Sequence, residues 1–254
     1  MIKDTLDRLN SELPATVKLV AVSKFHPFES ILEAYEAGQR AFAESRPQEF
    51  AAKVARAAEL RREHLESVGT DAAGDSYLDD IEWHFIGHLQ TNKLKMVLPY
   101  ASLVQSIDSL HLLEAIDKWG MQNSKVTDIL LECHISSDAA KQGFSEAEVE
   151  AFVSSRKEYP YVHIRGVMGM ATLTDDENII REDFARLVRM HDLLQDWIGE
   201  SPNLPHLHSD HSIDNSGWTC NEISMGMSDD YPIAVEAGST MVRIGSMIFG
   251  PRQY

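Results

Sequence analysis

The stretch Val17-Lys18-Leu19-Val20-Ala21-Val22-Ser23-Lys24 is a short apolar run that ends in a lysine, and Phe25-His26-Pro27 follow it. A continuous apolar run bounded by polar residues and a proline is typical of a buried parallel strand. A lysine at the carboxyl end of such a strand lies where α/β proteins place their chemistry, under the loops that follow the strands. Partial desolvation there makes an amine nucleophilic toward carbonyls. Lys24 is therefore the first candidate site residue, against the alternative of a lysine that simply points into solvent.

A regular alternation of apolar runs and amphipathic stretches continues along the chain. It predicts eight strands, at residues 17–24, 40–43, 82–86, 103–107, 128–135, 162–168, 219–224 and 240–244. It predicts helices at residues 27–37, 47–65, 110–119, 146–156, 176–197 and 232–237. This β–α alternation favours an α/β protein with a single (β/α)8 TIM barrel, preceded here by an extra amino-terminal helix. Because no linker or repeat interrupts the pattern, residues 1–254 are predicted to form one domain.

Composition and charge exclude several classes of protein. The chain has 254 residues, of which 43% are hydrophobic and 25% charged, as in an ordinary globular protein. Its net charge of −17, without an offsetting basic stripe, argues against a nucleic-acid partner. The polar start Met1-Ile2-Lys3-Asp4 has no signal-peptide core, and no apolar run is long enough to span a membrane. Cys133 and Cys220 lack any CxxC or zinc spacing, so we expect a cytoplasmic protein with reduced thiols.

Two polar segments interrupt the alternation. Residues 66–80 are acidic and small, and residues 199–217 contain Pro, Ser and Gly, so both are predicted to be surface loops. The second segment contains four residues of types that bind metals: His206, His208, Asp210 and His211. A built metal site also needs outer hydrogen-bond partners that orient the ligands, and this loop does not offer them. A solvated loop without a metal is therefore the favoured interpretation.

A second candidate site lies near the carboxyl terminus, where residues 241–250 are typical of a strand, a glycine turn and the start of a short helix. Backbone N–H groups at a helix start bind phosphate, and in TIM barrels such a site often follows the last two strands. Gly245 and Ser246 are the candidate cradle, and Ser224 at the end of the preceding strand offers a hydroxyl. Because the first and eighth strands are neighbours in a closed barrel, a phosphate held here leaves a ligand aldehyde within reach of Lys24. Pyridoxal phosphate needs this arrangement.

Five stretches of the chain support a resemblance to a known family. They are Ala21–Lys24 (AVSK), Phe42–Glu49 (FAESRPQE), Trp83–Lys93 (WHFIGHLQTNK), Ser224–Asp230 (SMGMSDD) and Gly238–Gly245 (GSTMVRIG). With these motifs the chain resembles the pyridoxal phosphate homeostasis family, a single-domain relative of the alanine racemase barrel. The likeness extends over nearly the whole chain, and the last two motifs are highly specific.

The resemblance implies a cofactor and the residues that hold it. Lys24 would hold pyridoxal 5′-phosphate as an imine, and Arg243 matches the arginine that faces the pyridine nitrogen in the racemase barrel. The phosphate would contact four residues of the last two motifs and the turn after them: Ser224, Met225, Gly245 and Ser246. The family has Gly-Glu-Asn where this chain has Ala43-Glu44-Ser45. Ser45 keeps a hydroxyl but loses the amide, and it stays a candidate cofactor contact.

Four further residues near strand ends are candidates with open alternatives. His88, in the loop after the third strand, could reach the mouth of the cofactor site. Met168, with Met170 after the sixth strand, supplies either core packing or an apolar surface for the cofactor ring. Glu44 is either a pocket carboxylate or a cap for the helix that starts at Pro47, and the sequence does not decide between these roles.

Three functions are compatible with a reactive lysine in this fold. The first is a binding and carrier protein, not an enzyme, that buffers pyridoxal phosphate and delivers it to apo-enzymes without turnover. The second is a small racemase or lyase that uses Lys24 as its base, with the cofactor as the electron sink. The third is an aldolase-type barrel enzyme for phosphorylated sugars, which would contain no cofactor.

Two features favour the carrier. An arginine opposite the ring nitrogen disfavours protonation of the ring and weakens the electron sink. Racemases of the related fold add a tyrosine base from the carboxyl-terminal domain of a partner subunit, and this chain, which ends at Tyr254, is expected to lack such a domain. We therefore expect a cytoplasmic monomer whose partners are the cofactor and, transiently, apo-enzymes.

Overall fold

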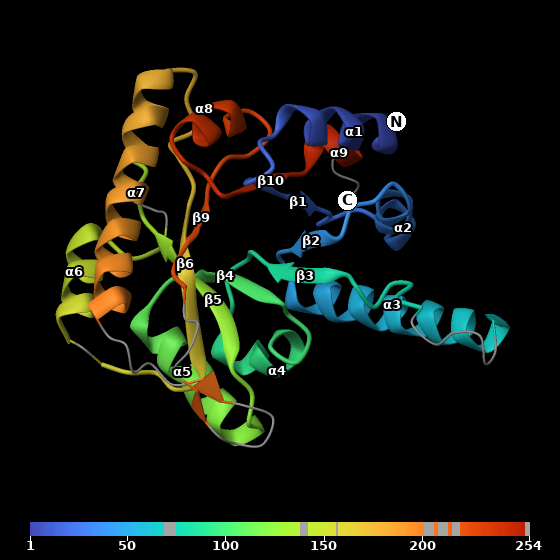
Figure 1. The fold of residues 1–254 in the computed structure, drawn as a ribbon, viewed down its shortest axis with the longest axis horizontal. Coiled ribbons are helices and arrows are strands. Elements are labelled where there is room, and N and C mark those ends of the chain that lie inside the picture. The colour runs from blue at the N-terminus through green and yellow to red at the C-terminus, as the bar shows by residue number, and fades with distance from the viewer. Residues whose placement is uncertain are drawn as a thin grey trace.

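The barrel closes through β1 (Lys18–Val22), which pairs in parallel with β10 (Met241–Ile244) on one side and with β2 (Ala41–Glu44) on the other. The structure is a computed structural model. It describes residues 1–68, 75–137, 142–155, 157–200, 206–207, 213–214 and 219–251. Within these residues, eight parallel strands form a closed barrel in the order β1-β10-β9-β6-β5-β4-β3-β2 (Figure 1). The predicted (β/α)8 barrel is confirmed, and its first and last strands are neighbours as expected.

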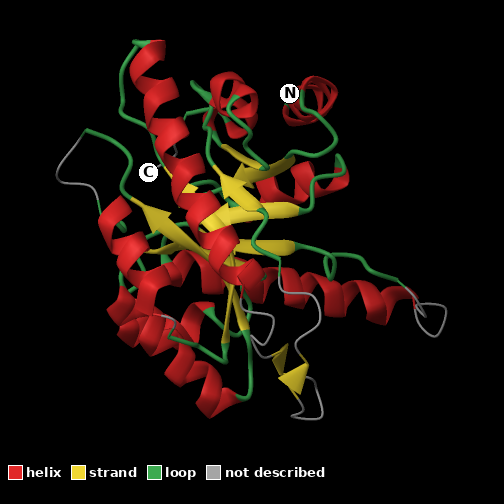
Figure 2. Cartoon of the chain, turned by 60° about the vertical axis from the view of Figure 1, so that its left-hand side comes forward, coloured by secondary structure: helices red, strands yellow, loops and turns green. Residues whose placement is uncertain are grey.

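The remaining barrel strands alternate with helices. The strands are β3 (Glu82–Phe85), β4 (Leu103–Ile107), β5 (Thr127–Cys133), β6 (Val162–Gly169) and β9 (Glu222–Ser224). The helices are α1 (Ile2–Glu12), α2 (Phe28–Glu36), α3 (Pro47–Val68), α4 (Leu94–Val97), α5 (Leu110–Asn123), α6 (Glu146–Ser155), α7 (Glu177–Glu200), α8 (Tyr231–Glu236) and α9 (Ser246–Phe249). Figure 2 shows the helices arranged around the strands. The expected amino-terminal helix is α1, which packs beside α2 and α9.

Apolar side chains form two layers, because successive residues of a strand point to opposite faces. Val20 and Val22 point into the barrel. There they pack with Ala41, Ala43, Leu103, Leu130, Met168 and Met241. A larger cluster, which includes Phe42, Phe50 and Phe184, lies between the barrel and the helices. Strands buried on both faces give continuous apolar runs, which is why the first run of the sequence indicated the fold.

Charged side chains occupy the amino-terminal end of the barrel. Lys18 Nζ lies 2.6 Å from Glu82 Oε2. Arg165 pairs with Asp128 at 2.9 Å and with Glu222 at 3.4 Å. These ion pairs lie at one end of the barrel, and the interior side chains lie between this charged end and the carboxyl ends of the strands.

The two segments predicted as surface loops differ in part from the structure. Helix α3 continues to Val68, into the segment 66–80, because strong helix breakers are absent before Gly69. In the segment 199–217, α7 extends to Glu200, and β7 (His206–Leu207) pairs antiparallel with β8 (Ile213–Asp214). Pairing satisfies backbone groups that an irregular loop would leave to water. Residues 69–74 lie outside the described residues.

Of the four residues in the histidine-rich loop, His206 lies among the described residues, in β7. His208, Asp210 and His211 lie outside the described residues. In the part of the chain that the structure describes, no group of three or more His, Cys, Asp or Glu side chains is arranged to hold a metal ion. The described helices also include none with the length and apolar character needed to cross a bilayer.

Candidate functional site

A cavity of about 280 Å³ lies at the carboxyl ends of β1, β6 and β10. It is lined by Val22, Lys24, His26, Ile86, Met168, Met170, Met227, Ser228, Asp229, Arg243, Gly245, Ser246 and Gly250. Five of the predicted cofactor contacts are among these residues: Lys24, Met168, Arg243, Gly245 and Ser246. The other four predicted contacts, Ser45, His88, Ser224 and Met225, are not among the described residues that line it.

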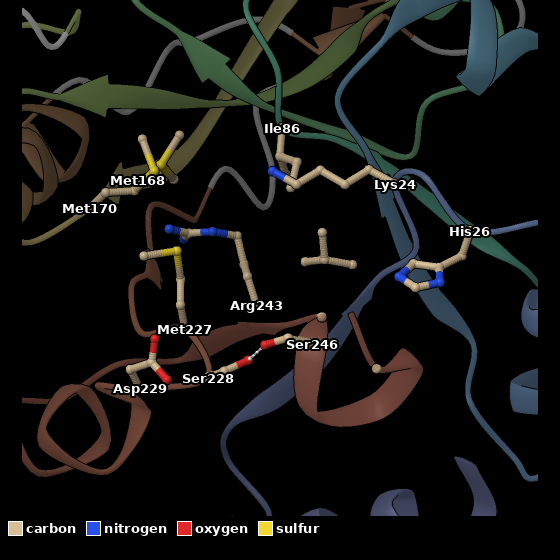
Figure 3. Close-up of a pocket in the computed structure, with 13 residues that line it drawn as sticks. Lys24, His26, Ile86, Met168, Met170, Met227, Ser228, Asp229, Arg243 and Ser246 are labelled. Carbon is tan, nitrogen blue, oxygen red and sulfur yellow. Dashed lines mark hydrogen bonds between the residues drawn. The ribbon is translucent and has the colours of Figure 1, made fainter. Parts of the chain in front are cut away.

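Lys24 enters the cavity from the turn after β1. Figure 3 shows its side chain extended across one side of the cavity, with the amine beside Ile86. Phe25, the next residue, has a φ of +67°, a left-handed conformation that is rare for a bulky side chain. The turn is fixed by hydrogen bonds, since His26 N donates to the Ser23 carbonyl at 3.1 Å and Phe25 N donates to Glu49 Oε1 at 2.8 Å. The direction of the lysine therefore depends on its neighbours in the turn.

The glycine turn after β10 faces Lys24 across the cavity (Figure 3). Ser246 Oγ donates to Ser228 Oγ over 3.0 Å, and Ser246 begins α9. The N–H groups of a first helical turn have no partner within the helix. A Cβ on Gly245 would lie 3.1 Å from the Val22 carbonyl oxygen, so glycine permits the turn to pack closely on β1. This side of the cavity therefore presents hydroxyl and N–H groups that suit an anion.

Arg243 supplies a fixed positive charge between these two sides. Its side chain is buried, with Nη1 donating to Ser224 Oγ at 2.6 Å and Nη2 to the Gly169 carbonyl at 3.0 Å. Burial lowers the pKa of Arg243 to about 10, while Asp230 and Glu132 act in the opposite direction. The guanidinium therefore stays charged at neutral pH.

Ser224 belongs to an interior polar column that continues from Arg243 toward the other end of the barrel. Its Oγ donates to Gln105 Oε1 over 2.7 Å, and Gln105 Nε2 donates to His84 Nδ1 over 2.8 Å. His84 Nε2 lies 3.7 Å from Glu82 Oε2. Burial lowers the pKa of His84, so the ring is neutral, and acceptance at Nδ1 assigns its proton to Nε2. The Ser224 hydroxyl thus bonds Gln105 and Arg243, and its contact with a phosphate stays a prediction.

The other three predicted contacts, Met225, His88 and Ser45, are outside the lining of the cavity. Met225 is fully buried, and its N–H donates to the carbonyl of Met241 at 3.1 Å. His88 is half-exposed, with Nδ1 2.9 Å from Asp108 Oδ2. Ser45 is half-buried in the loop after β2. Their contact with a cofactor also stays a prediction.

Glu44 lies behind the cavity wall. It is fully buried, and its Oε1 accepts hydrogen bonds from Ser23 Oγ at 2.6 Å and from Lys53 Nζ at 2.7 Å. Burial raises the pKa of Glu44 to about 7 against the effect of Lys53. Glu44 is not among the described residues that line the cavity, and the hydrogen-bond partners of its carboxylate are a lysine and a serine, not helix N–H groups.

Sequence reasoning missed several lining residues. Val22 and Ile86 could have been found, because both lie near the carboxyl ends of predicted strands, and in the predicted strand 17–24 Val22 is two residues before Lys24. His26 and Asp229 lie in turns, where no periodicity predicts the direction of a side chain. His26 is buried, and its ring is tilted by 33° against that of Phe249, with the centroids 5.3 Å apart. Burial lowers the pKa of His26, so it is neutral at pH 7.

The barrel and its cavity define a class of protein, a (β/α)8 barrel with a lysine after the first strand and a glycine turn after the last. The family model described as "Alanine racemase, N-terminal domain" matches residues 1–214. The pyridoxal phosphate homeostasis protein of Vibrio alginolyticus is 36% identical over 95% of this chain and 89% of its own length. That of Escherichia coli strain K12 is 31% identical over 95% of this chain and 88% of its own. The chain belongs to the pyridoxal phosphate homeostasis protein family within the alanine racemase amino-terminal class.

Solved structures agree with this assignment. PipY of Synechococcus elongatus PCC7942, whose structure has pyridoxal phosphate bound, is 30% identical, with a TM-score of 0.76 over 98% of this chain and 100% of its own. Alanine racemase from Corynebacterium glutamicum aligns with a TM-score of 0.65 over 99% of this chain and 60% of its own, at 14% identity. The second likeness concerns the fold alone.

Proposed function

We propose that this protein binds pyridoxal 5′-phosphate and acts in its intracellular homeostasis, by buffering the cofactor and delivering it without turning over a substrate. The observation that supports this most is the meeting of Lys24, Arg243 and the Gly245–Ser246 turn in one cavity of about 280 Å³. That volume is close to the lower end of the range for small-molecule sites, roughly 300–1,000 Å³. The names of the relatives and the cofactor bound to PipY support the same ligand.

Each part of the cofactor has a matching group in the cavity. The amine of Lys24 would bond the aldehyde carbon as a Schiff base, with loss of water. The hydroxyls of Ser228 and Ser246, with the N–H groups that begin α9, suit the phosphate. Met168 offers a polarisable apolar contact for the ring. Arg243 places a cation deep in the cavity, on the side proposed for the ring nitrogen.

Binding is favoured over catalysis by the groups around the cavity. When bound, the cofactor supplies an electron sink, but turnover at an amino-acid carbon also needs protein bases placed on the correct faces. The charge of Arg243 disfavours a second positive charge on the ring nitrogen. Lys24 and His26 come from the same turn and reach the cavity from the same side (Figure 3). Among the described residues that line the cavity, none is a tyrosine.

The absorption spectrum of the purified protein before and after borohydride reduction tests the proposal. We expect a visible imine band in the wild type, loss of that band in Lys24→Ala, and a reduced adduct that mass spectrometry places on Lys24. An adduct on Lys93 would contradict the assignment of the site. Incubation with a panel of L-amino acids and chiral chromatography tests turnover, and sustained product that disappears in Lys24→Ala would favour the racemase or lyase.

Delivery is tested by mixing the loaded protein with an apo-enzyme that needs pyridoxal phosphate. Activity that appears faster than free release of the cofactor allows would support direct transfer, and activity limited by free release would restrict the role to buffering. We place this function in a cytoplasmic monomer. Cys133 and Cys220 are buried free thiols, which fits a reducing compartment.

A further inference from the structure

Helix α3 buries a lysine where its pattern calls for an apolar residue. Phe50, Lys53 and Ala57 form the buried face of α3, and Lys53 is 6% exposed. A lysine is almost never buried in this way unless its charge is paired. The partners of Lys53 explain its burial and connect it to the cavity.

The ammonium group of Lys53 has three oxygen partners. Nζ donates to Glu44 Oε1 at 2.7 Å, to Glu49 Oε1 at 2.8 Å and to the Ser23 carbonyl at 2.9 Å. An ammonium group has three donors, so these three acceptors satisfy it fully. Glu44 ends β2, and Glu49 lies in the first turn of α3. We call Lys53, Glu44 and Glu49 the Lys53 cluster.

The Lys53 cluster holds the residues on both sides of Lys24. On the amino side, the Ser23 carbonyl accepts from Lys53, and Ser23 Oγ donates to Glu44 over 2.6 Å. On the carboxyl side, Phe25 N donates to Glu49 Oε1 over 2.8 Å. The backbone that leads to the lysine and the backbone that leaves it are therefore attached to one buried group of charges.

Phe25 shows why the attachment matters. Its φ of +67° is unfavourable for a residue with a Cβ, and such a conformation persists only where surrounding contacts maintain it. The hydrogen bond to Glu49 is one such contact, and Glu49 is in turn held by Lys53. If Phe25 relaxed, the peptide between Lys24 and Phe25 would rotate and move the amine relative to the cavity.

We propose that Lys53, acting with Glu44 and Glu49, is a positioning residue that holds the Lys24 amine in reach of the aldehyde of a bound phosphopyridine ligand. The inference rests on the proposed function, because it requires that Lys24 bonds such an aldehyde. Lys53 is not among the residues that line the cavity. Its effect therefore falls on the covalent link and leaves recognition of the ring and phosphate intact.

Stability alone explains the Lys53 cluster poorly. Replacing a buried ion pair by well-packed apolar residues is often neutral or stabilising, because desolvation offsets the attraction between the charges. The cluster does supply three directed hydrogen bonds to the two residues that flank Lys24. Directed hydrogen bonds define a single conformation more closely than apolar packing does.

The test compares two ligands in Lys53→Met, which keeps the side chain unbranched and one atom shorter and removes its charge. Pyridoxal phosphate can form the covalent link, whereas 4′-deoxypyridoxine 5′-phosphate lacks the aldehyde and cannot. We expect binding of pyridoxal phosphate to weaken by roughly 10- to 100-fold, the loss typical of a misplaced reacting group. Affinity for the aldehyde-free ligand should equal that of the wild type. Titration by fluorescence measures both affinities, and borohydride trapping measures the rate of formation of the link.

Two further variants serve as controls. Lys125→Met removes another partly buried lysine, whose Nζ donates to the carbonyls of Leu98 and Pro99 at 2.7 and 2.8 Å, away from the cavity. It should change neither affinity. The double variant Glu44→Gln with Lys53→Met leaves no unpaired buried charge at position 44, so it should fold even where Lys53→Met does not. It should show the same selective loss, which is weaker binding of pyridoxal phosphate with an unchanged affinity for the aldehyde-free ligand.

The outcomes separate this inference from the proposed function. If the folded single or double variant binds pyridoxal phosphate as the wild type does, or loses both ligands in parallel, the positioning role is overturned. If the wild type itself forms no adduct on Lys24, the proposed function and this inference fail together. A selective loss of affinity for the aldehyde ligand supports both the positioning role of Lys53 and the proposed function.

Discussion

Arg243 Nη1 donates to Ser224 Oγ over 2.6 Å, so the serine that the sequence assigns to a phosphate cradle is bonded to the arginine of the same site. The hydroxyl donates its own proton to Gln105, 119 residues away in the sequence. Each donor in this arrangement has one acceptor, and the guanidinium is held in one orientation as a result. The charge that faces the cavity is therefore set by residues deep in the barrel.

Gln105→Leu should disturb Arg243 without touching the cavity. The change removes the acceptor of the Ser224 proton and the donor to His84, in a fully buried place. An unpaired buried polar group costs about 1–3 kcal/mol of folding free energy. We also expect the absorption maximum of the cofactor-loaded protein to shift, because Arg243 loses its fixed orientation. Urea unfolding and absorption spectroscopy measure the two effects.

The control for this variant is the next residue on β4. Ser106 Oγ donates to the Gly87 carbonyl over 2.6 Å, outside the interior polar column. Ser106→Ala should lose stability and keep the wild-type spectrum. A spectrum that is the same in Gln105→Leu and the wild type would contradict the link between the column and Arg243.

Gly245→Val should weaken binding of pyridoxal phosphate more than Ser246→Ala does. A Cβ on residue 245 would lie 3.1 Å from the Val22 carbonyl, so a branched side chain must move the turn and with it several donors. Ser246→Ala removes a single hydroxyl, and a lost hydrogen bond to a charged group costs about 1.5–3 kcal/mol. Isothermal titration of both variants measures the difference. Pyridoxal without phosphate should bind far more weakly to the wild type, and equal affinity for the two vitamers would refute the cradle.

Because His84 is buried and neutral, the free energy of unfolding of the protein should fall as the pH is lowered. Burial lowers the pKa of His84 below its ordinary value of 6.5, so on acidification the unfolded chain binds the proton first. The stability that the neutral ring contributes is fully present above pH 6.5 and is lost as the pH falls through the folded-state pKa. Per pH unit in that window, the wild type should lose up to about 1.4 kcal/mol relative to His84→Gln. Urea unfolding of both proteins between about pH 5 and 8 measures the difference, and parallel profiles would contradict the prediction.

Gly166→Ala should prevent β6 and β9 from pairing correctly. Gly166 has a φ of +151°, and a Cβ there would lie 1.8 Å from the Glu222 carbonyl oxygen of β9. We expect a loss of about 3 kcal/mol or more, in the range of backbone strain combined with a steric clash. Gly38→Ala is the matched control, because Gly38 has a φ of +100° with nothing within 4 Å of the added Cβ. It should cost only about 1 kcal/mol of backbone strain, and equal losses in the two variants would show that contact with Glu222 does not matter.

Local patterns in the chain determine the barrel and the end of it that holds the site. The order of strands and helices follows from periodicity, which depends on neighbours a few residues apart. Lys24 and Gly245 follow the first and last strands, and parallel strands place their carboxyl ends at one edge, so their meeting follows from the order of the strands alone. The prediction that Arg243 is a site residue comes from the family resemblance, because the last of the five motifs contains it.

Tertiary structure alone decides where the polar side chains of that site point and what they bond. Ser224 turns toward Gln105, and Lys53 lies 30 residues from the Ser23 carbonyl that it holds. Contacts of this kind exist only after the barrel has closed and brought distant strands and helices into register. A hydrogen bond depends on distances of a few tenths of an ångström and on direction, which residue type and spacing do not specify. The sequence by itself therefore determines which groups reach the cavity end of the barrel, and the closed fold determines which of them face the ligand and which hold the others in place.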